Sequence, residues 1–278
     1  MLLTPGPTAV PEFVRTAMSG ETLHHRTPEF ENIFKNTREL LLEILQMPEA
    51  VMLASSGTGA MEACVTNLTH KKALTINSGK FGERFGKIAQ AHNIPFSELK
   101  YEWNTPASVE DVVEMISNDD QIDALFIQIC ESAGGLRHPV EEIAKAVKNI
   151  NKNIMVVADG ITAVGVEKID TTNLDALITG SQKALMLPPG LAIIGFSNEA
   201  VAKIESKSYG YYFNLATEIK KYNRYKNLPL IAVTSRTGKS DRMRGVESGM
   251  VEYITKPYSS DYLASVVQRN INFKSEFL

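Results

Sequence analysis

Short apolar runs alternate with amphipathic stretches along residues 50 to 197 of the chain. The apolar runs are rich in strand-favouring residues and end at turn residues. They predict buried strands over residues 50–56, 73–78, 123–130, 153–159, 175–181 and 191–197. Apolar positions at helical spacing predict helices over residues 28–46, 59–70, 81–93, 108–119 and 139–150. Strands and helices that alternate in this way are typical of an α/β fold with a mostly parallel sheet.

The pattern changes in the last quarter of the chain. Residues 207–227 are rich in tyrosine and lysine and show no strong period. A compact pattern then begins, in which strand, helix, strand and helix are predicted over residues 228–235, 238–249, 251–257 and 259–271. We therefore expect a separate β-α-β-α tail.

Composition narrows the classes of partner. The 278 residues are 44% hydrophobic and 22% charged, and the net charge is −3, so nothing favours binding to nucleic acid or an anionic membrane. No apolar run approaches the ~20 residues of a membrane span, and the first residues lack the pattern of a signal peptide. We expect a cytoplasmic location. Cys64 and Cys130 lie in apolar stretches and are expected to be small buried side chains.

Polar residues with distinct chemistry follow three of the predicted strands. Ser56, Gly57 and Thr58 stand between a strand and a helix, where free backbone N–H groups suit a phosphate, although a capped turn is the simpler alternative. Asp159 ends an apolar strand, where it could hold a cationic ring nitrogen or cap the next turn. Lys183 follows another strand. Desolvation there would lower its pKa and make it an amine nucleophile, whereas an isolated lysine would usually reach solvent.

These three features together match a pyridoxal phosphate site. Ligands bind at the carboxyl ends of strands in α/β sheets, so the three features are expected to meet. Such a site needs a lysine that forms an imine with the cofactor aldehyde and an acidic partner for the pyridine nitrogen. The sequence therefore predicts a covalent link through Lys183, with Pro188–Gly190 fixing the chain just after it.

Residues 1 to about 226 resemble the class V aminotransferases, specifically the alanine–glyoxylate and serine–pyruvate group of fold-type I pyridoxal phosphate enzymes. Seven motifs in the family's order carry this resemblance: TPGPTAVPE at 4–12, HHRTPEF at 24–30, SSGTGAMEA at 55–63, SGKFGERF at 78–85, ESAGG at 131–135, VVADGITAVGV at 156–166 and GSQKALMLPPG at 180–190. The resemblance implies the large domain of that fold.

It also implies roles for individual residues. Lys183 corresponds to the Schiff-base lysine and Asp159 to the partner of the ring nitrogen, and these two are the expected catalytic residues. The expected cofactor contacts are Ser56, Gly57, Thr58 and Gln182 for the phosphate, Phe81 and Ile161 for the two ring faces, and Ser132 for the ring oxygen. Ala133 and Gly134 depart from the family's pattern. Residues 5–7 resemble the loop that approaches the substrate, and residues 24–26 resemble a segment beside the active site. No third ligand accompanies His24 and His25, so no metal site is expected.

The implied reaction moves an amino group from a small amino acid, alanine or serine, to a 2-oxo acid, glyoxylate or pyruvate. Freed Lys183 would act as general base and then as general acid. The resemblance also implies a homodimer. A relative of the cysteine desulfurases is a further alternative, but neither cysteine is expected in an exposed loop.

The resemblance to the transaminases stops near residues 224–228. The family's small C-terminal domain and its carboxylate-binding arginine have no counterpart. We therefore expect weak cofactor binding and slow transfer, unless Arg26, Arg137 or an arginine of the tail substitutes.

Residues 227–278 instead resemble the second half of a chemotaxis response-regulator receiver domain. Thr234 and Tyr253 match its switch residues, and Lys256 matches its phosphate-contacting lysine. The half with the phosphoacceptor aspartate is absent. The alternative to an active transaminase is thus an inactive or signalling-associated fusion that contacts a chemotaxis protein through this tail.

Overall fold

The computed structural model describes residues 4–223, 230–235, 238 and 250–272 of the chain. The chain forms two compact units, Met1–Lys220 and Lys221–Leu278. Each unit is described by itself.

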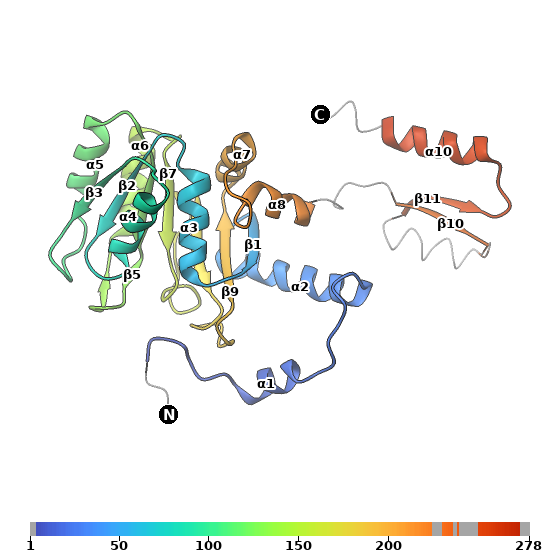
Figure 1. The fold of residues 1–278 in the computed structure, drawn as a ribbon, viewed down its shortest axis with the longest axis horizontal. Helices are drawn as coiled ribbons and strands as arrows, with labels where there is room; N and C mark the ends of the chain where they lie inside the picture. Colours follow the sequence, from blue (N-terminus) through green and yellow to red (C-terminus); the bar gives the residue numbers. More distant parts are fainter. Residues whose placement is uncertain (1–3, 224–229, 236–237, 239–249, 273–278) are drawn as a thin grey trace. The chain divides into compact units, whose positions relative to one another are not determined.

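A seven-stranded sheet forms the centre of the first unit (Figure 1). Its strands lie in the order β1 (Glu49–Ala54), β9 (Leu191–Phe196), β8 (Ala176–Gly180), β7 (Met155–Asp159), β4 (Ile122–Gln128), β2 (Lys72–Asn77) and β3 (Phe96–Lys100). The five strands from β8 to β3 are parallel, and only β9 runs antiparallel to its neighbours β1 and β8. The expected α/β fold with a mostly parallel sheet is confirmed.

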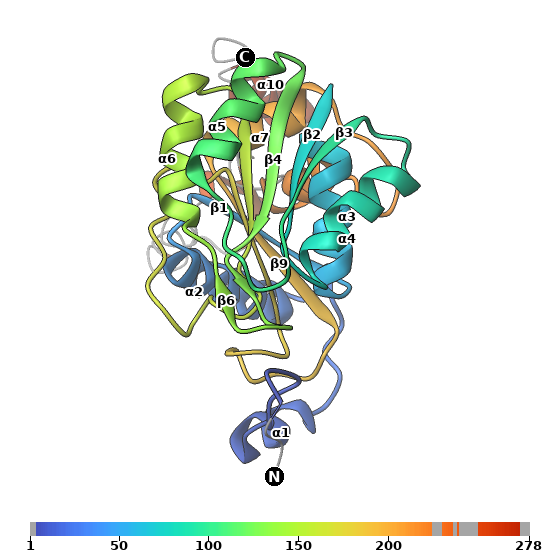
Figure 2. The same ribbon diagram turned by 90° about the vertical axis from the view of Figure 1, so that its left-hand side faces the viewer.

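Helices cover both faces of this sheet (Figure 2). One face carries α3 (Gly57–Leu68) and α4 (Gly82–Ala91), and α7 (Asn198–Ser206) packs on α3. The other face carries α5 (Val109–Asn118) and α6 (Val140–Ile150), and α2 (Pro28–Leu45) adds Leu41 and Leu45 to the core on that side. Both faces of the parallel strands are therefore buried, which explains why these strands read as continuous apolar runs.

Three helices and two strands of the described residues were not predicted from the pattern. They are α1 (Glu12–Met18), α7, α8 (Leu215–Asn223), β3 and the short β6 (Leu136–Arg137). Residues 207–227 show no strong period in the sequence, yet they contain α8. Its apolar positions are few, but Leu215 and Ile219 are one helical turn apart and fully buried, and the Asn214 side chain accepts a hydrogen bond from the Thr217 N–H at 2.9 Å.

A small hairpin lies between β4 and α6. It pairs β5 (Cys130–Glu131) with β6 (Leu136–Arg137) in antiparallel register. The hairpin follows the carboxyl end of β4, so it brings residues 130–135 to the edge of the sheet at which the parallel strands end.

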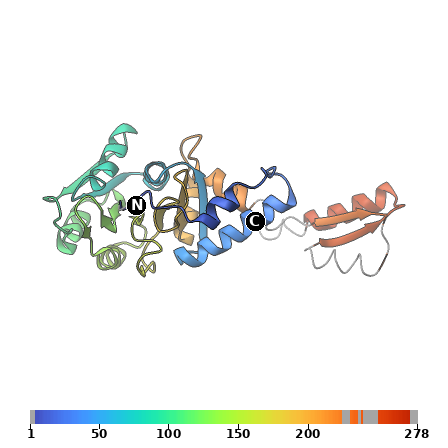
Figure 3. The ribbon, with the colours of Figure 1, turned by 90° about the horizontal axis from the view of Figure 1, so that it is seen from below.

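The second unit contains β10 (Leu230–Thr234), β11 (Met250–Thr255) and α10 (Ser260–Asn272), drawn in orange to red in Figure 3. β10 and β11 pair in parallel. Ile254 and Val266 are buried within this unit. The helix predicted over residues 238–249 falls almost wholly outside the described residues.

In the described part of the chain, no helix combines the length and the apolar character that crossing a membrane requires.

Candidate active site

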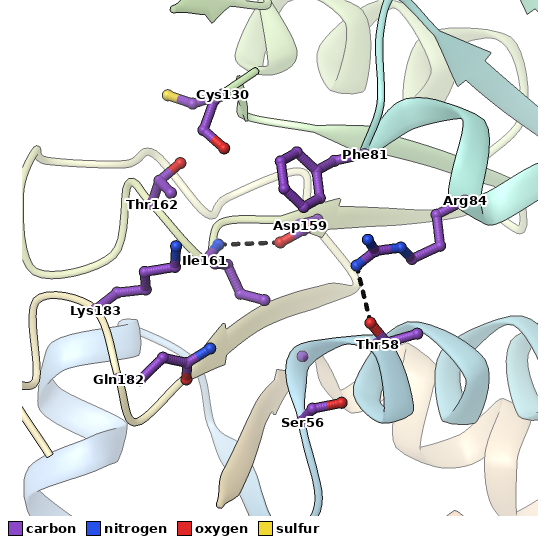
Figure 4. Close-up of a pocket in the computed structure, with 12 residues that line it drawn as sticks. Ser56, Thr58, Phe81, Arg84, Cys130, Asp159, Ile161, Thr162, Gln182 and Lys183 are labelled. Atoms are coloured by element: carbon purple, nitrogen blue, oxygen red, sulfur yellow. Dashed lines mark hydrogen bonds between the residues drawn. The ribbon is translucent and has the colours of Figure 1, made fainter. Parts of the chain in front are cut away.

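A pocket of about 130 Å³ lies where β7 and β8 end and α3 begins (Figure 4). Its walls are Ser56, Gly57, Thr58, Phe81, Arg84, Cys130, Ser132, Asp159, Ile161, Thr162, Gln182 and Lys183. All nine residues that the sequence predicts for the cofactor site are among them. They come from five separate segments of the chain, and the parallel strands bring these segments to one edge of the sheet.

The amino end of α3 forms the floor of the pocket in Figure 4. Ser56 occupies the N-cap position, but its side chain makes no capping hydrogen bond, so the hydroxyl is available to a ligand. Gly57 is buried, and a Cβ atom at this position would overlap the Ile161 side chain. The first N–H groups of a helix have no partner within the helix. This end of the pocket therefore suits an anion such as a phosphate.

Asp159 is the last residue of β7 and is only 6% exposed. One of its carboxylate oxygens accepts a hydrogen bond from the Ile161 N–H at 3.0 Å. Burial raises the pKa of Asp159 to about 6, and Glu131 adds to this rise, whereas the Ile161 N–H, Arg84 and Lys183 oppose it. At neutral pH the side chain is thus a carboxylate that gains from a cationic group beside it.

The raised pKa of Asp159 predicts a pH-dependent cost to the stability of the cofactor-free protein. Above pH 6 the buried side chain must be ionised, and below its ordinary pKa of 3.8 it is neutral in both the folded and the unfolded states. Stability therefore falls as the pH rises through this range. Asp159→Asn should raise the free energy of unfolding by up to about 3 kcal/mol at pH 7.5 and by less at pH 5. Urea unfolding followed by the fluorescence of Trp103 measures the difference. An equal change in the free energy of unfolding at both pH values would contradict the raised pKa of Asp159.

Lys183 lies in the turn after β8, and this turn is tied back to the sheet. The Ser181 hydroxyl donates to the Pro188 carbonyl at 2.7 Å and accepts from the Leu191 N–H at 3.2 Å. Desolvation lowers the pKa of Lys183, and the nearby Asp159 carboxylate opposes this shift. A lowered pKa gives the amine a larger neutral fraction at physiological pH, which is the form that attacks an aldehyde.

Glu131 joins the start of α4 to the loop that carries Ser132. Its side chain, 1% exposed, accepts hydrogen bonds from the Phe81 and Gly82 N–H groups at 2.8 and 2.9 Å and from the Ala133 N–H at 3.2 Å. These charge-assisted bonds fix the backbone of Phe81 and hence the position of its ring.

Three lining residues were not predicted: Arg84, Cys130 and Thr162. Arg84 donates to the Thr58 hydroxyl at 2.8 Å, and its guanidinium carbon lies 4.9 Å from the centre of the Phe81 ring. Its spacing of three residues from Phe81 within a predicted helix was a usable signal, because residues at this spacing share a helix face.

The expectation for the cysteines holds for Cys64, which is fully buried, but is wrong for Cys130. Cys130 is half-buried in β5, where it lines the pocket at the rim of the hydrophobic core. Burial raises the pKa of the Cys130 thiol, and Glu167 adds to the effect. A protonated thiol is a poor nucleophile, which does not favour the desulfurase alternative.

The other residues considered from the sequence lie in different places. Gly6 packs against the Lys183 side chain, whereas His24 and Arg26 are exposed and do not line the pocket. The guanidinium of Arg137 is paired with Glu141 at 2.7 Å and with Glu167 at 3.0 Å. It is therefore not available as a substitute for a carboxylate-binding arginine. No group of three or more metal-binding side chains occurs among the residues that the structure describes.

Three known proteins are similar to this chain over about three quarters of its length. An uncharacterised aminotransferase of Helicobacter pylori is 52% identical over 220 residues, which are 79% of this chain and 60% of the relative. A serine–glyoxylate aminotransferase of Methylorubrum extorquens is 29% identical over 215 residues, 74% of this chain and 54% of that protein. The crystal structure of a subgroup IV aspartate aminotransferase from Thermus thermophilus matches with a TM-score of 0.72 and 33% identity, covering 78% of this chain and 62% of that one.

The chain thus spans less than two thirds of the length of these relatives. A further match is the sensor histidine kinase CheAY of Helicobacter pylori, which is 40% identical over 147 residues, 52% of this chain and 17% of the kinase.

The class-V aminotransferase family matches residues 7–231, which include every segment that lines the pocket. By this match, and by the fold that carries it, the chain belongs to the class-V aminotransferase family.

Proposed function

We propose that the chain is a pyridoxal phosphate-dependent aminotransferase that moves an amino group from alanine or serine to glyoxylate or pyruvate. Membership of the family implies the cofactor. The observation that carries the proposal is the meeting of Lys183, Asp159 and the amino end of α3 in one pocket, although they are far apart in the sequence.

The donor set of the pocket fits this cofactor. The Ser56 hydroxyl, the backbone at Gly57 and Thr58, and the Gln182 amide would hold its phosphate. Phe81 and Ile161 would contact the two faces of its ring, Ser132 its ring oxygen, and Asp159 its ring nitrogen. When bound covalently to Lys183, the cofactor supplies a ring that accepts the electron pair released at the substrate α-carbon.

The chain's own residues then perform three tasks. The Asp159 carboxylate keeps the proton on the ring nitrogen, and Arg84 helps to keep this carboxylate ionised. Lys183, whose pKa is lowered, accepts and returns the α-proton of the substrate. Glu131 and Arg84 hold Phe81 in place, so the aromatic ring of Phe81 is already ordered before the reaction begins.

We infer the substrates from the similarity of this chain to other proteins. The seven sequence motifs resemble the alanine–glyoxylate and serine–pyruvate group, and one relative is named a serine–glyoxylate aminotransferase. We expect slow transfer, because neither Arg26 nor Arg137 lines the pocket, so neither can hold the substrate carboxylate from there.

A transfer assay tests the function. The purified chain is incubated with pyridoxal phosphate, glyoxylate and either alanine, serine or aspartate, and glycine is quantified by chromatography. We expect slow glycine formation with alanine and serine, at least about tenfold faster than with aspartate, a rate ratio equivalent to ~1.4 kcal/mol. A chain that binds the cofactor yet forms no glycine with any donor would refute the proposal and favour the inactive fusion.

We also propose that residues 227–278 are a receiver-like segment that contacts a chemotaxis protein. Parallel β10 and β11 followed by α10 support this, and so does the match to CheAY. The first half of a receiver, with the phosphoacceptor, is not part of this sequence. Sequencing the gene across residues 220–230 tests whether both segments share one reading frame. Two separate frames would refute the fusion.

A homodimer is the expected assembly of the first unit. Ile33, Leu40 and Ile44 are exposed on α2, and apolar side chains that gather on one helix favour association. Light scattering coupled to gel filtration measures the mass, and a monomer at micromolar concentration would rule out a stable dimer.

A further inference from the structure

We propose that Gly6 is a positioning residue that sets where the Lys183 amine lies, because it has no side chain. The inference deepens the proposed function and rests on it, since it concerns the amine that would hold the cofactor. Gly6 is separated from Lys183 by most of the first unit's sequence, so only the fold brings the two together.

The segment that carries Gly6 is fixed to the backbone of the lysine turn. The Thr8 N–H donates to the Gln182 carbonyl at 3.0 Å, and the Thr8 hydroxyl donates to the Lys183 carbonyl at 2.8 Å. Two hydrogen bonds to adjacent carbonyls define both the position and the direction of the segment. Because Gly6 is only two residues from Thr8, these bonds fix its position relative to the backbone of Lys183.

The contact at Gly6 leaves no room for a side chain. A Cβ atom there would overlap Lys183 Cδ and would lie 2.7 Å from both Cε and Nζ. Ordinary van der Waals contacts of a Cβ atom begin near 3.4 Å. All three atoms belong to the flexible end of the lysine, so alanine at this position would displace the amine rather than the backbone.

The backbone conformation itself does not require glycine at this position. Gly6 is absent from the glycines with positive φ in the described residues, which are Gly135, Gly165, Gly190 and Gly210. The three atoms nearest to a Cβ atom at this position all belong to the Lys183 side chain, so this side chain is the first that glycine accommodates. The N-terminal segment forms a wall that holds the amine on its pocket side, where the attacking nitrogen must be placed within about an ångström for efficient reaction.

The matched pair of variants is Gly6→Ala and Gly20→Ala. A Cβ atom at Gly20 would meet only the Ala17 carbonyl oxygen, at 3.4 Å, and Gly20 also has no positive φ. Two rates are measured for each protein. The first is the carbamylation of Lys183 by cyanate in the cofactor-free protein, read by peptide mass spectrometry. The second is the formation of the covalent link to pyridoxal phosphate, read by absorbance.

Gly6→Ala should form the covalent link about 10- to 100-fold more slowly, the range that a misplacement of about an ångström produces. Its Lys183 should react several-fold faster with cyanate, because the amine leaves its packed position. Gly20→Ala should match the unsubstituted protein in both assays. The thermal unfolding midpoint of both variants should stay within a few degrees of that protein, so slower linkage cannot be attributed to unfolding.

Unchanged rates in both assays for a folded Gly6→Ala protein would overturn the inference. If this variant does not fold, Thr8→Val tests the same wall, because it keeps the volume and removes the hydroxyl bond to Lys183. Its Lys183 should also react faster with cyanate, and an unchanged rate would overturn the inference. If the unsubstituted protein forms no link to pyridoxal phosphate, the proposed function fails, while the cyanate rates still decide the role of Gly6.

Discussion

Lys183→Ala is expected to abolish the covalent attachment of pyridoxal phosphate and to reduce transfer by about 10²–10⁴-fold or more, the contribution of a positioned general base. The substitution removes both the amine that links to the aldehyde and the group that moves the α-proton. No other lysine lines the pocket among the residues that the structure describes, so no described residue is placed to replace it. Absorbance in the visible range and glycine formation measure the two losses.

Lys145→Ala is the matched control for this prediction. Lys145 is exposed on α6, in a helix where alanine is favourable, and it does not line the pocket. It should leave both readouts unchanged. A visible band that survives in Lys183→Ala would show that another amine holds the cofactor.

Asp159→Asn is expected to reduce kcat/KM by about 10²–10³-fold, the effect of removing one preorganised charge-stabilising group. The amide keeps the shape of the carboxylate but cannot hold the proton on the ring nitrogen. The same substitution should make the cofactor-free protein more stable at neutral pH, because burial of a charge is relieved. The substitution is thus expected to lower kcat/KM while it raises the stability of the folded protein, so a loss of activity cannot be attributed to unfolding.

Asp120→Asn is the control for Asp159. Asp120 is exposed in the turn before β4, where its side chain only accepts a hydrogen bond from Gln121 at 2.7 Å. It should change neither kcat/KM nor stability appreciably. A fall in kcat/KM of less than about tenfold for Asp159→Asn, equivalent to ~1.4 kcal/mol, would mean that Asp159 does not partner the ring.

The parallel strands could be predicted from the sequence because both their faces are buried. Their apolar runs are continuous and end at turns, as do those of β1 and β9, so all six strands predicted over residues 50–197 occur in the seven-stranded sheet. β3 escaped prediction because it is an edge strand with polar Ser97, Glu98 and Lys100 among its five residues. In the same way, two apolar side chains, Leu215 and Ile219, are fully buried among those of α8 whose burial the structure describes, and two positions show little of a period.

The position of the pocket could be predicted for a different reason. Strand ends are visible in the sequence, and parallel strands place their carboxyl ends together, so Asp159 and Lys183 had to approach one another. Arg84 was missed although its spacing of three residues from Phe81 indicates a shared helix face. Cys130 was missed because its exposure depends on how β5 packs. The contact between Gly6 and Lys183 could not be predicted either, because no local sequence pattern shows which glycine a distant side chain will pack against.

The most direct test of the central claim is the mapping of the covalent link. The protein is incubated with pyridoxal phosphate, reduced with borohydride, digested and analysed by tandem mass spectrometry. The account predicts a single pyridoxyl phosphate group on the peptide from the turn after β8, attached to Lys183. A group on a different lysine, or none at all on correctly folded protein, would contradict it.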